Sequence, residues 1–179
     1  MVTDVTKAER QSAKAVNFGF AFGMGAARFV AYALENYGVA LSIAEAASFK
    51  QSYLHAYPGV AAWQRGIKAA MPLEVRSASG RTWRFPDRAK GYSQRLNMPV
   101  QGTAADGLKA AIVLLQPRLD VLGARLLLAV HDELVVEVPE ERAAEALAAV
   151  EEAMINGMKR FVNTVPIKVE ACVRKTWAA

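Results

Sequence analysis

The sequence has few of the residues that form disulfides or structural zinc sites. In 179 residues it contains one cysteine, Cys172, and two histidines. A single cysteine cannot form an internal disulfide, and this set cannot complete a Cys/His zinc site. The apolar runs, such as residues 126–130, are far shorter than the ~20 residues that a membrane span needs, and no charged-then-apolar leader follows Met1. The sequence therefore predicts a reducing compartment and no membrane partner.

Acidic side chains are the scarcer charge, with Asp+Glu 17 against Lys+Arg 22 and a formal net charge of +5. The excess lies in residues 1–110, which hold 14 basic and 7 acidic residues, whereas residues 111–179 hold 8 and 10. Within residues 76–95, aromatic residues lie between the basic ones, as in surfaces that track phosphates. A solvated basic loop would have the same composition. The basic residues of this segment are Arg76, Arg81, Arg84, Arg88, Lys90 and Arg95.

Hydrophobic residues make up 53% of the chain, which is enough for a folded core and excludes disorder. Periodicity and caps predict an all-helical segment over residues 1–72, and helix and strand patterns alternate over residues 73–179. We therefore expect an α+β fold, in which a helical segment precedes a segment with a small antiparallel sheet and flanking helices. The expected helices cover residues 7–22, 26–37, 43–57, 58–71, 98–116 and 139–162, and the expected strands lie in a hairpin over 75–85 and at 124–130, 134–138 and 167–173.

Single residues set several of these boundaries. Gly38 follows the second expected helix, as glycine does at helix C-termini. Ser42 and Glu45 form a capping box that opens the third expected helix. Pro117 is expected to end the helix that begins near Met98, because proline cannot donate the backbone hydrogen bond.

A stripe of two cations and two rings runs along the first expected helix, where Arg10, Lys14, Phe18 and Phe22 recur every four residues. Four residues rise ~6 Å and turn ~400°, so these side chains share one face. The order suits a nucleoside triphosphate, because its phosphates need cations and its sugar and base need a flat apolar surface. An amphipathic helix with core phenylalanines and solvated cations would show the same spacing.

A second group, His131, Asp132 and Glu133, lies between two apolar segments expected to be strands. Hairpin turns that need positive φ usually contain Asn-Gly or Asp-Gly, and this turn instead has an imidazole and two adjacent carboxylates. Adjacent carboxylates suit Mg²⁺, which prefers oxygen ligands and binds substrate phosphates. In a two-metal site the ions lie ~3.5–4 Å apart, so a further acid from elsewhere in the fold is needed. An ordinary acidic turn is the alternative.

A third group opens the helix expected from Met98. Asn97 and Gln101 are four residues apart, so they share a face if Pro99 permits helical geometry. Amide side chains can donate to the acceptors that all base pairs offer in the minor groove, which checks pair shape without reading sequence. Helix capping by Asn97 is the alternative.

Taken together and in this order, the three groups resemble the polymerase domain of family A DNA polymerases, the bacterial DNA polymerase I type. RQSAKAVNFGFAFG (10–23) resembles that family's motif B, NMPVQGTAAD (97–106) its N-x-P-x-Q-G-T-A-A-D segment, and LLLAVHDELVVEVP (126–139) its motif C. The resemblance covers essentially the whole chain and implies a helical fingers segment followed by part of the palm. Further similar segments are YPGVAAW (57–63), SGRTWRFPD (79–87) and KTWAA (175–179).

The resemblance implies a nucleotide-binding role for the stripe. Arg10 and Lys14 would bind the phosphates of the incoming deoxynucleoside triphosphate, Phe18 would lie against its sugar, and Phe22 would stack near the templating base. The implied reaction is attack by the primer 3′-OH on the α-phosphate, with release of pyrophosphate. This sequence has Phe22 where the family usually has tyrosine, which keeps the ring and loses a hydroxyl.

The resemblance also implies metal and DNA ligands. Asp132 and Glu133 would hold Mg²⁺, with two ions in the complete site, and these carboxylates and Lys14 would be the catalytic residues. Primer-template DNA would be bound by Asn97, Gln101, His131, Arg81 and Arg84. This sequence has Ser93 where the family usually has arginine, and Arg95, two positions away, points to about the opposite face of a helix.

The family's motif A, whose aspartate is the other metal ligand, is absent from these 179 residues. We therefore expect the C-terminal half of a polymerase domain that needs an N-terminal half carrying motif A and has little activity alone. A non-catalytic DNA-binding or nucleotide-binding module and an inactive polymerase remnant are the alternatives. The expected location is the cytoplasm. The protein would be associated with the nucleoid if it is bacterial, and would lie in the host cytoplasm if a phage encodes it.

Overall fold

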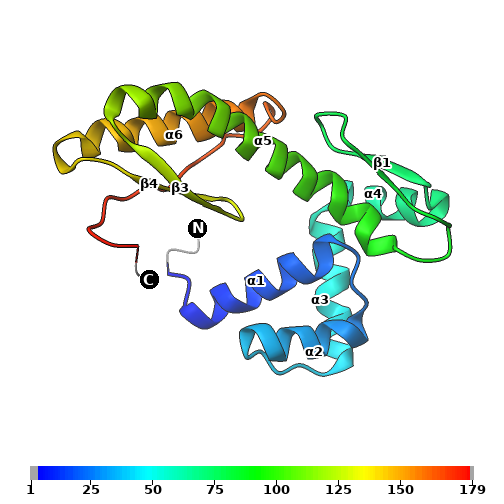
Figure 1. Cartoon of the computed structure of the whole chain (residues 1–179). Helices are drawn as coiled ribbons and strands as arrows, with labels where there is room; N and C mark the ends of the chain where they lie inside the picture. The colour runs from blue at the N-terminus through cyan, green and yellow to red at the C-terminus, as the bar shows by residue number, and fades with distance from the viewer. Residues whose placement is uncertain (1–3, 178–179) are drawn as a thin grey trace. The chain divides into compact units, whose positions relative to one another are not determined.

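Helices form most of the chain in the computed structural model, which describes residues 4–177 (Figure 1). Strand β1 pairs with β2, and β3 pairs antiparallel with β4. The α+β class expected from the sequence is confirmed. Among residues 4–177 we find no helix with the length and apolarity of a membrane span. The elements in chain order are α1 (Lys7–Ala21), α2 (Ala26–Tyr37), α3 (Ile43–Ala56), α4 (Pro58–Ala70), β1 (Glu74–Arg76), β2 (Thr82–Arg84), α5 (Tyr92–Leu122), β3 (Arg125–Val130), β4 (Glu133–Glu137), the 3-10 helix η1 (Glu140–Arg142) and α6 (Ala143–Lys159).

The chain divides into two compact units that interleave along the sequence. The first comprises the residues up to Val75 together with Trp83–Met98, and the second comprises Arg76–Thr82 together with the residues from Pro99 onward. The expected division into a fingers segment over residues 1–72 and a palm segment over residues 73–179 stays a prediction. Helix α5 contributes its first residues to one unit and the remainder to the other.

Local caps explain where α1 and α3 begin and where α2 ends. Ser42 and Glu45 form the expected capping box at α3, and Thr6 and Glu9 form a second one at α1. In both, a hydroxyl accepts from a backbone N–H that has no partner inside the helix. Helix α2 ends at Gly38, which adopts φ 67° and so needs the freedom of glycine.

The core of the first unit forms where α1, α2 and α3 meet. Phe20 and Phe29 are fully buried, and their ring centroids are 4.2 Å apart. Gly19 allows this approach, because a Cβ on it would lie 2.5 Å from the ring of Phe29. One face of α1 is therefore buried by packing, and the opposite face is left at the surface.

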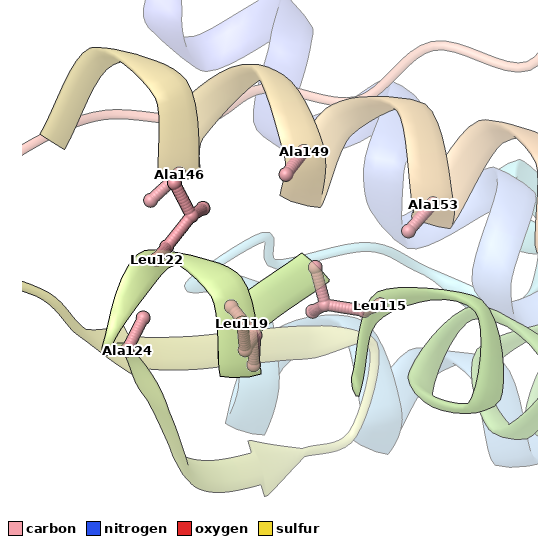
Figure 2. Packing of buried hydrophobic residues seen from close by; sticks show 7 residues of the cluster. All are labelled: Leu115, Leu119, Leu122, Ala124, Ala146, Ala149 and Ala153. Atoms are coloured by element: carbon pink, nitrogen blue, oxygen red, sulfur yellow. The ribbon is translucent and has the colours of Figure 1, made fainter. Parts of the chain in front are cut away.

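The core of the second unit forms between α5 and α6, where leucines of α5 lie against alanines of α6 (Figure 2). Gly157 brings the two backbones close together, since a Cβ there would lie 2.5 Å from the backbone nitrogen of Ala111 and 2.7 Å from the carbonyl oxygen of Gly107. The hairpin of β3 and β4 packs on this core through partly buried residues. The cluster comprises Leu115, Leu119, Leu122, Ala124, Ala146, Ala149 and Ala153.

Helix α5 differs from the expected helix over residues 98–116. It begins at Tyr92 and continues through Pro117 to Leu122. A proline inside a helix costs ~3 kcal/mol, because it removes one hydrogen bond and crowds the preceding turn. Beyond Pro117, Leu119 is fully buried and Leu122 is 8% exposed. Burial of each leucine contributes ~1.5–3 kcal/mol, which offsets the cost of the proline.

The expected strand over residues 167–173 is wrong for this structure, in which the segment has no regular secondary structure. Its alternating sequence suits a strand, but a strand needs a neighbour to satisfy its backbone groups. In residues 4–177 the sheets are two pairs, β1 with β2 and β3 with β4. The expected helix over 139–162 is shorter than predicted, because it opens with η1 and ends at Lys159.

We expect Gly157→Ala to destabilise the second unit by about 1–3 kcal/mol, because the new methyl group would meet backbone atoms of α5. Gly66→Ala in α4 is the matched control, since no atom lies within 4 Å of its added Cβ. There, alanine should stabilise by about 0.5–1 kcal/mol. Denaturant unfolding of both variants measures the difference. Equal stabilities would contradict the close approach of α5 and α6.

Candidate functional site

The cation and ring stripe lies on the surface of α1. Arg10, Lys14 and Phe18 are exposed, and Phe18 is 59% exposed although it is a large apolar side chain. Phe20, about 200° further around the helix than Phe18, is fully buried. The amphipathic alternative required Phe18 to lie in the core of this chain, and it does not. A solvent-facing ring one turn from a cation is a surface that can take a ligand with charged and flat parts.

Phe22 directly follows α1, and the end of this helix is held from two sides. The Nε2 of Gln64 donates to the carbonyl oxygens of Phe20 at 2.6 Å and Ala21 at 3.0 Å. The Nζ of Lys50 donates to the carbonyl oxygen of Met24 at 2.9 Å. The last carbonyl groups of a helix have no partner inside the helix, so the bonds from Gln64 satisfy those of Phe20 and Ala21. The bond from Lys50 holds the segment that follows the helix. Sequence analysis missed Gln64, because an isolated glutamine inside a helix gives no signal of burial.

Gly23 sets how closely helix α5 approaches the end of α1. It adopts φ 78°, and a Cβ on it would lie 2.5 Å from the ring of Tyr92. The hydroxyl of Tyr92 in turn donates to the backbone oxygen of Gln64 at 3.3 Å. Burial raises the pKa of Tyr92, so its hydroxyl stays protonated as a donor. The position of Phe22 is thus defined by α1, α4 and the start of α5.

The acidic turn connects β3 to β4 as expected, but only His131 and Asp132 lie in it. Val130 pairs with Glu133, which begins β4. His131 adopts φ 55°, although the turn lacks the glycine that such a conformation favours. A strained backbone of this kind persists where the surrounding structure holds it, and it occurs often at functional sites. The strands hold His131, Asp132 and Glu133 at the surface, where all three are exposed.

Two carboxylates, those of Asp132 and Glu133, lie at this turn. Residues 4–177 contain no group of three or more His, Cys, Asp or Glu side chains that could hold a metal ion. Asp132 and Glu133 suit Mg²⁺ as oxygen ligands, but adjacent carboxylates alone do not complete a site that also holds substrate phosphates. The additional acid expected from the sequence stays a prediction.

The two amides expected to contact DNA lie on α5, where Gln101 is exposed and Asn97 is half-buried. Pro99 lies inside the helix, so helical geometry continues between them. The Oδ1 of Asn97 is buried and accepts no hydrogen bond from the described residues. Capping by Asn97 does not apply, because the helix begins at Tyr92.

The basic segment 76–95 is partly structural. Arg95 is fully buried, its Nε donates to the carbonyl oxygen of Pro72 at 2.7 Å, and its guanidinium lies 3.9 Å from the ring centroid of Phe85. Further bonds join it to the carbonyl oxygens of Asp87 and Lys90. The interpretation of this segment as a phosphate-tracking surface is therefore wrong for Arg95.

The remaining cations of that segment differ in exposure. Arg84 is 84% exposed and lies 3.4 Å from a carboxylate oxygen of Glu74, a pair that solvent largely screens. Arg81 is 38% exposed and lies 2.7 Å from a carboxylate oxygen of Asp106, which is 10% exposed. Arg84 thus keeps an accessible charge, whereas the charge of Arg81 is matched inside the fold.

Comparison with known proteins matches the chain to one family. The sequence model described as DNA polymerase family A matches residues 1–179. DNA polymerase I, thermostable, from Thermus filiformis is 42% identical over 94% of this chain and 20% of its own length, and DNA polymerase I from Aquifex aeolicus is 35% identical over 97% and 31%. The chain thus spans about a fifth to a third of the length of these relatives.

A solved structure agrees with the sequence relatives. The POL domain of Pol1 from M. smegmatis, in complex with DNA primer-template and dNTP, superposes with a TM-score of 0.74 at 28% identity. The similarity covers 88% of this chain and 29% of that one.

We expect Gln64→Leu to destabilise the chain by about 1–3 kcal/mol, because the carbonyl groups of Phe20 and Ala21 would lose a buried donor. Gln116→Leu is the control, since Gln116 is exposed and bonds only to the exposed Asp120 among the hydrogen bonds we identify. Its effect should stay within about 0.5 kcal/mol. Urea unfolding measures both, and faster hydrogen exchange at the amides of Gly23 and Met24 should accompany the first. Unchanged exchange there would contradict the role of Gln64.

Proposed function

Because the chain belongs to DNA polymerase family A, we propose that it carries the nucleotide-binding face and part of the catalytic centre of a template-directed DNA polymerase. The observation that carries the proposal is the exposed row of Arg10, Lys14 and Phe18 on α1. A solvated ring and two unburied cations in this order suit a deoxynucleoside triphosphate. Such an enzyme serves DNA replication and repair.

The proposed reaction is nucleotidyl transfer. The primer 3′-OH attacks the α-phosphate of the incoming nucleotide, the bond to the β-phosphate breaks, and pyrophosphate leaves. Negative charge builds up on the phosphate oxygens in such a step, and fixed cations stabilise it. Lys14 and Arg10 would supply those cations. Phe18 would support the sugar, and Phe22, held by the end of α1, would lie near the templating base.

The second proposed ligand is primer-template DNA. We assign Asn97, Gln101 and His131 to the primer-template next to the reacting end. The hairpin that carries Arg81 and Arg84 would lie along the duplex, where Arg84 offers an accessible charge. The buried Oδ1 of Asn97, which accepts no hydrogen bond from the described residues, supports a contact with a donor outside the chain.

A divalent metal is implied by the family, and Asp132 and Glu133 are the residues that would hold it. Bound Mg²⁺ would polarise the reacting phosphate and lower the pKa of the primer hydroxyl. Two ions need a further carboxylate, which we assign to a motif A segment outside residues 1–179, on the same polypeptide or on a separate one. The exposed Leu127 and Leu128 of β3 support a missing neighbour, since they are 52% and 42% exposed.

The relatives named above are bacterial proteins that act on DNA, and on that ground we place the activity in the cytoplasm. The partners are then primer-template DNA, deoxynucleoside triphosphates and the segment that carries motif A.

Nucleotide binding by the stripe is tested with Lys14→Gln. We expect the affinity for a deoxynucleoside triphosphate to fall by about 10- to 100-fold, because a charge-assisted hydrogen bond contributes about 1.5–3 kcal/mol. Arg28→Gln is the matched control, since Arg28 is an exposed cation of the neighbouring helix α2 and lies outside the stripe. Equilibrium dialysis with labelled nucleotide measures both. Equal losses in the two variants would contradict a specific site on α1.

Catalysis is tested by Mg²⁺-dependent primer extension, with the chain alone and mixed with an N-terminal half that carries motif A from a related polymerase. We expect extension only in the mixture and its loss in Asp132→Asn, because that change removes a metal-binding charge. Glu137→Gln, at the far end of β4, removes an exposed charge away from the turn and should keep activity.

Other outcomes separate the alternatives. Extension by the chain alone, lost in Asp132→Asn, would show that an acid within residues 1–179 replaces motif A. No extension in the mixture, together with DNA binding that weakens with salt, would support a binding module. Neither extension nor DNA binding would support an inactive remnant.

A further inference from the structure

The carboxylate of Asp106 joins helix α5 to the turn over residues 77–81 between β1 and β2. One carboxylate oxygen, Oδ2, accepts hydrogen bonds from the hydroxyls of Ser77 at 2.7 Å and Ser79 at 2.5 Å. The other, Oδ1, lies 2.7 Å from Nη2 of Arg81. The side chain of Asp106 is 10% exposed. Donors from one turn therefore occupy both oxygens of an acid that is largely removed from solvent.

The same turn also bonds to residues of α5 that precede Asp106. The backbone N–H of Ala78 donates to Oγ1 of Thr103 at 2.9 Å, and Nη2 of Arg81 donates to the carbonyl oxygen of Gly102 at 3.0 Å. Both acceptors directly follow Gln101 in the helix, and all of these residues belong to the second unit. The 77–81 turn and the helical segment with Gln101 therefore form one hydrogen-bonded body.

The pairing with Asp106 limits the availability of the Arg81 charge for a phosphate. Burial by itself would raise the pKa of Asp106, but hydrogen bonds from Ser79 and Ser77 and the charges of Arg81 and Lys109 lower it below its usual value. The acid is thus ionised at neutral pH and needs its cation. If Arg81 left to bind a phosphate, the Asp106 carboxylate would lose its counter-charge and keep only the two serine hydroxyls, which is unfavourable.

We propose that Asp106 is a positioning residue for DNA binding, which holds the 77–81 turn against the part of α5 that carries Gln101. Arg81 is its internal partner and does not neutralise a phosphate. The inference rests on the proposed function, because it assigns the turn and α5 to one DNA-facing surface. It differs from the family resemblance, which implies only that Arg81 is a DNA ligand.

The sign of one charge change separates positioning from general electrostatics. Asp106→Asn raises the net charge by one, so a surface that attracts DNA only through its charge should bind more tightly. If Asp106 holds the turn in place, the same change should weaken binding. Asp120→Asn is the matched control, because Asp120 is an exposed acid of the same helix whose carboxylate accepts from Gln116. It changes the charge equally without touching the turn.

The experiment measures the affinity of the full chain for a labelled primer-template duplex by fluorescence anisotropy at several salt concentrations. We expect Asp106→Asn to weaken binding about tenfold, equal to one or two lost hydrogen bonds, and Asp120→Asn to leave it unchanged or tighter. Arg81→Gln should weaken binding without changing the dependence of affinity on salt. A lost phosphate contact would instead make the negative slope of log affinity against log salt less steep by about 0.9.

Two further measurements keep the inference testable if Asp106→Asn does not fold. Ser79→Ala removes one donor to Asp106 without a change of charge, and it should also weaken binding with an unchanged salt slope. Thermal unfolding of each variant should show that the loss of affinity occurs in a folded chain. In the folded variants, the amides of residues 78–81 should exchange hydrogen faster than in the unaltered chain.

The outcomes distinguish this inference from the proposed function. If the unaltered chain shows no salt-dependent DNA binding, the proposed function fails and this inference fails with it. If the unaltered chain binds, and Asp106→Asn binds equally or more tightly, this inference alone is wrong. A salt slope that becomes less steep by about 0.9 in Arg81→Gln would likewise overturn it, because Arg81 would then neutralise a phosphate.

Discussion

The carbonyl oxygens at the end of α1 must find donors, and much of the first unit depends on how they do. Gln64 of α4 and Lys50 of α3 supply donors to residues 20–24, and Tyr92 of α5 packs on Gly23 and bonds to Gln64. Buried carbonyl groups without donors are costly, so these elements are held together where α1 ends. The exposed stripe on the other face of α1 is thereby attached to a rigid support.

Some of the arginines make contacts inside the fold and do not present their charge at the surface. Arg95 is fully buried and donates to backbone carbonyl oxygens, and Arg81 is paired with Asp106. Both lie in a segment whose composition is typical of a phosphate-binding surface. The net positive charge of the chain therefore overstates the charge available to a polyanion. Exposed cations such as Arg10, Lys14 and Arg84 carry that role in the proposed function.

Small residues determine how the helices of the second unit pack, as hydrogen bonds do in the first unit. Gly157 and the alanines of α6 allow its backbone to approach α5, and leucines on both sides of Pro117 fill the space between them (Figure 2). This burial keeps α5 helical through a residue that usually ends a helix. Strands β3 and β4 pack on the same core, which supports the turn with His131 and Asp132.

The sequence alone determined what depends on near neighbours. The capping box of Ser42 and Glu45, the end of α2 at Gly38 and the α+β class follow from local hydrogen bonds and periodicity, and three ordered motifs identified the family. Tertiary structure decided the burial of Gln64 and Arg95, the pairing of Arg81 with Asp106 and the continuation of α5 past Pro117. It also left residues 167–173 without a partner strand in the described chain. All of these features depend on contacts between residues far apart in sequence. The free energy of such contacts exceeds the local helix, strand and turn preferences that can be recognised in a sequence.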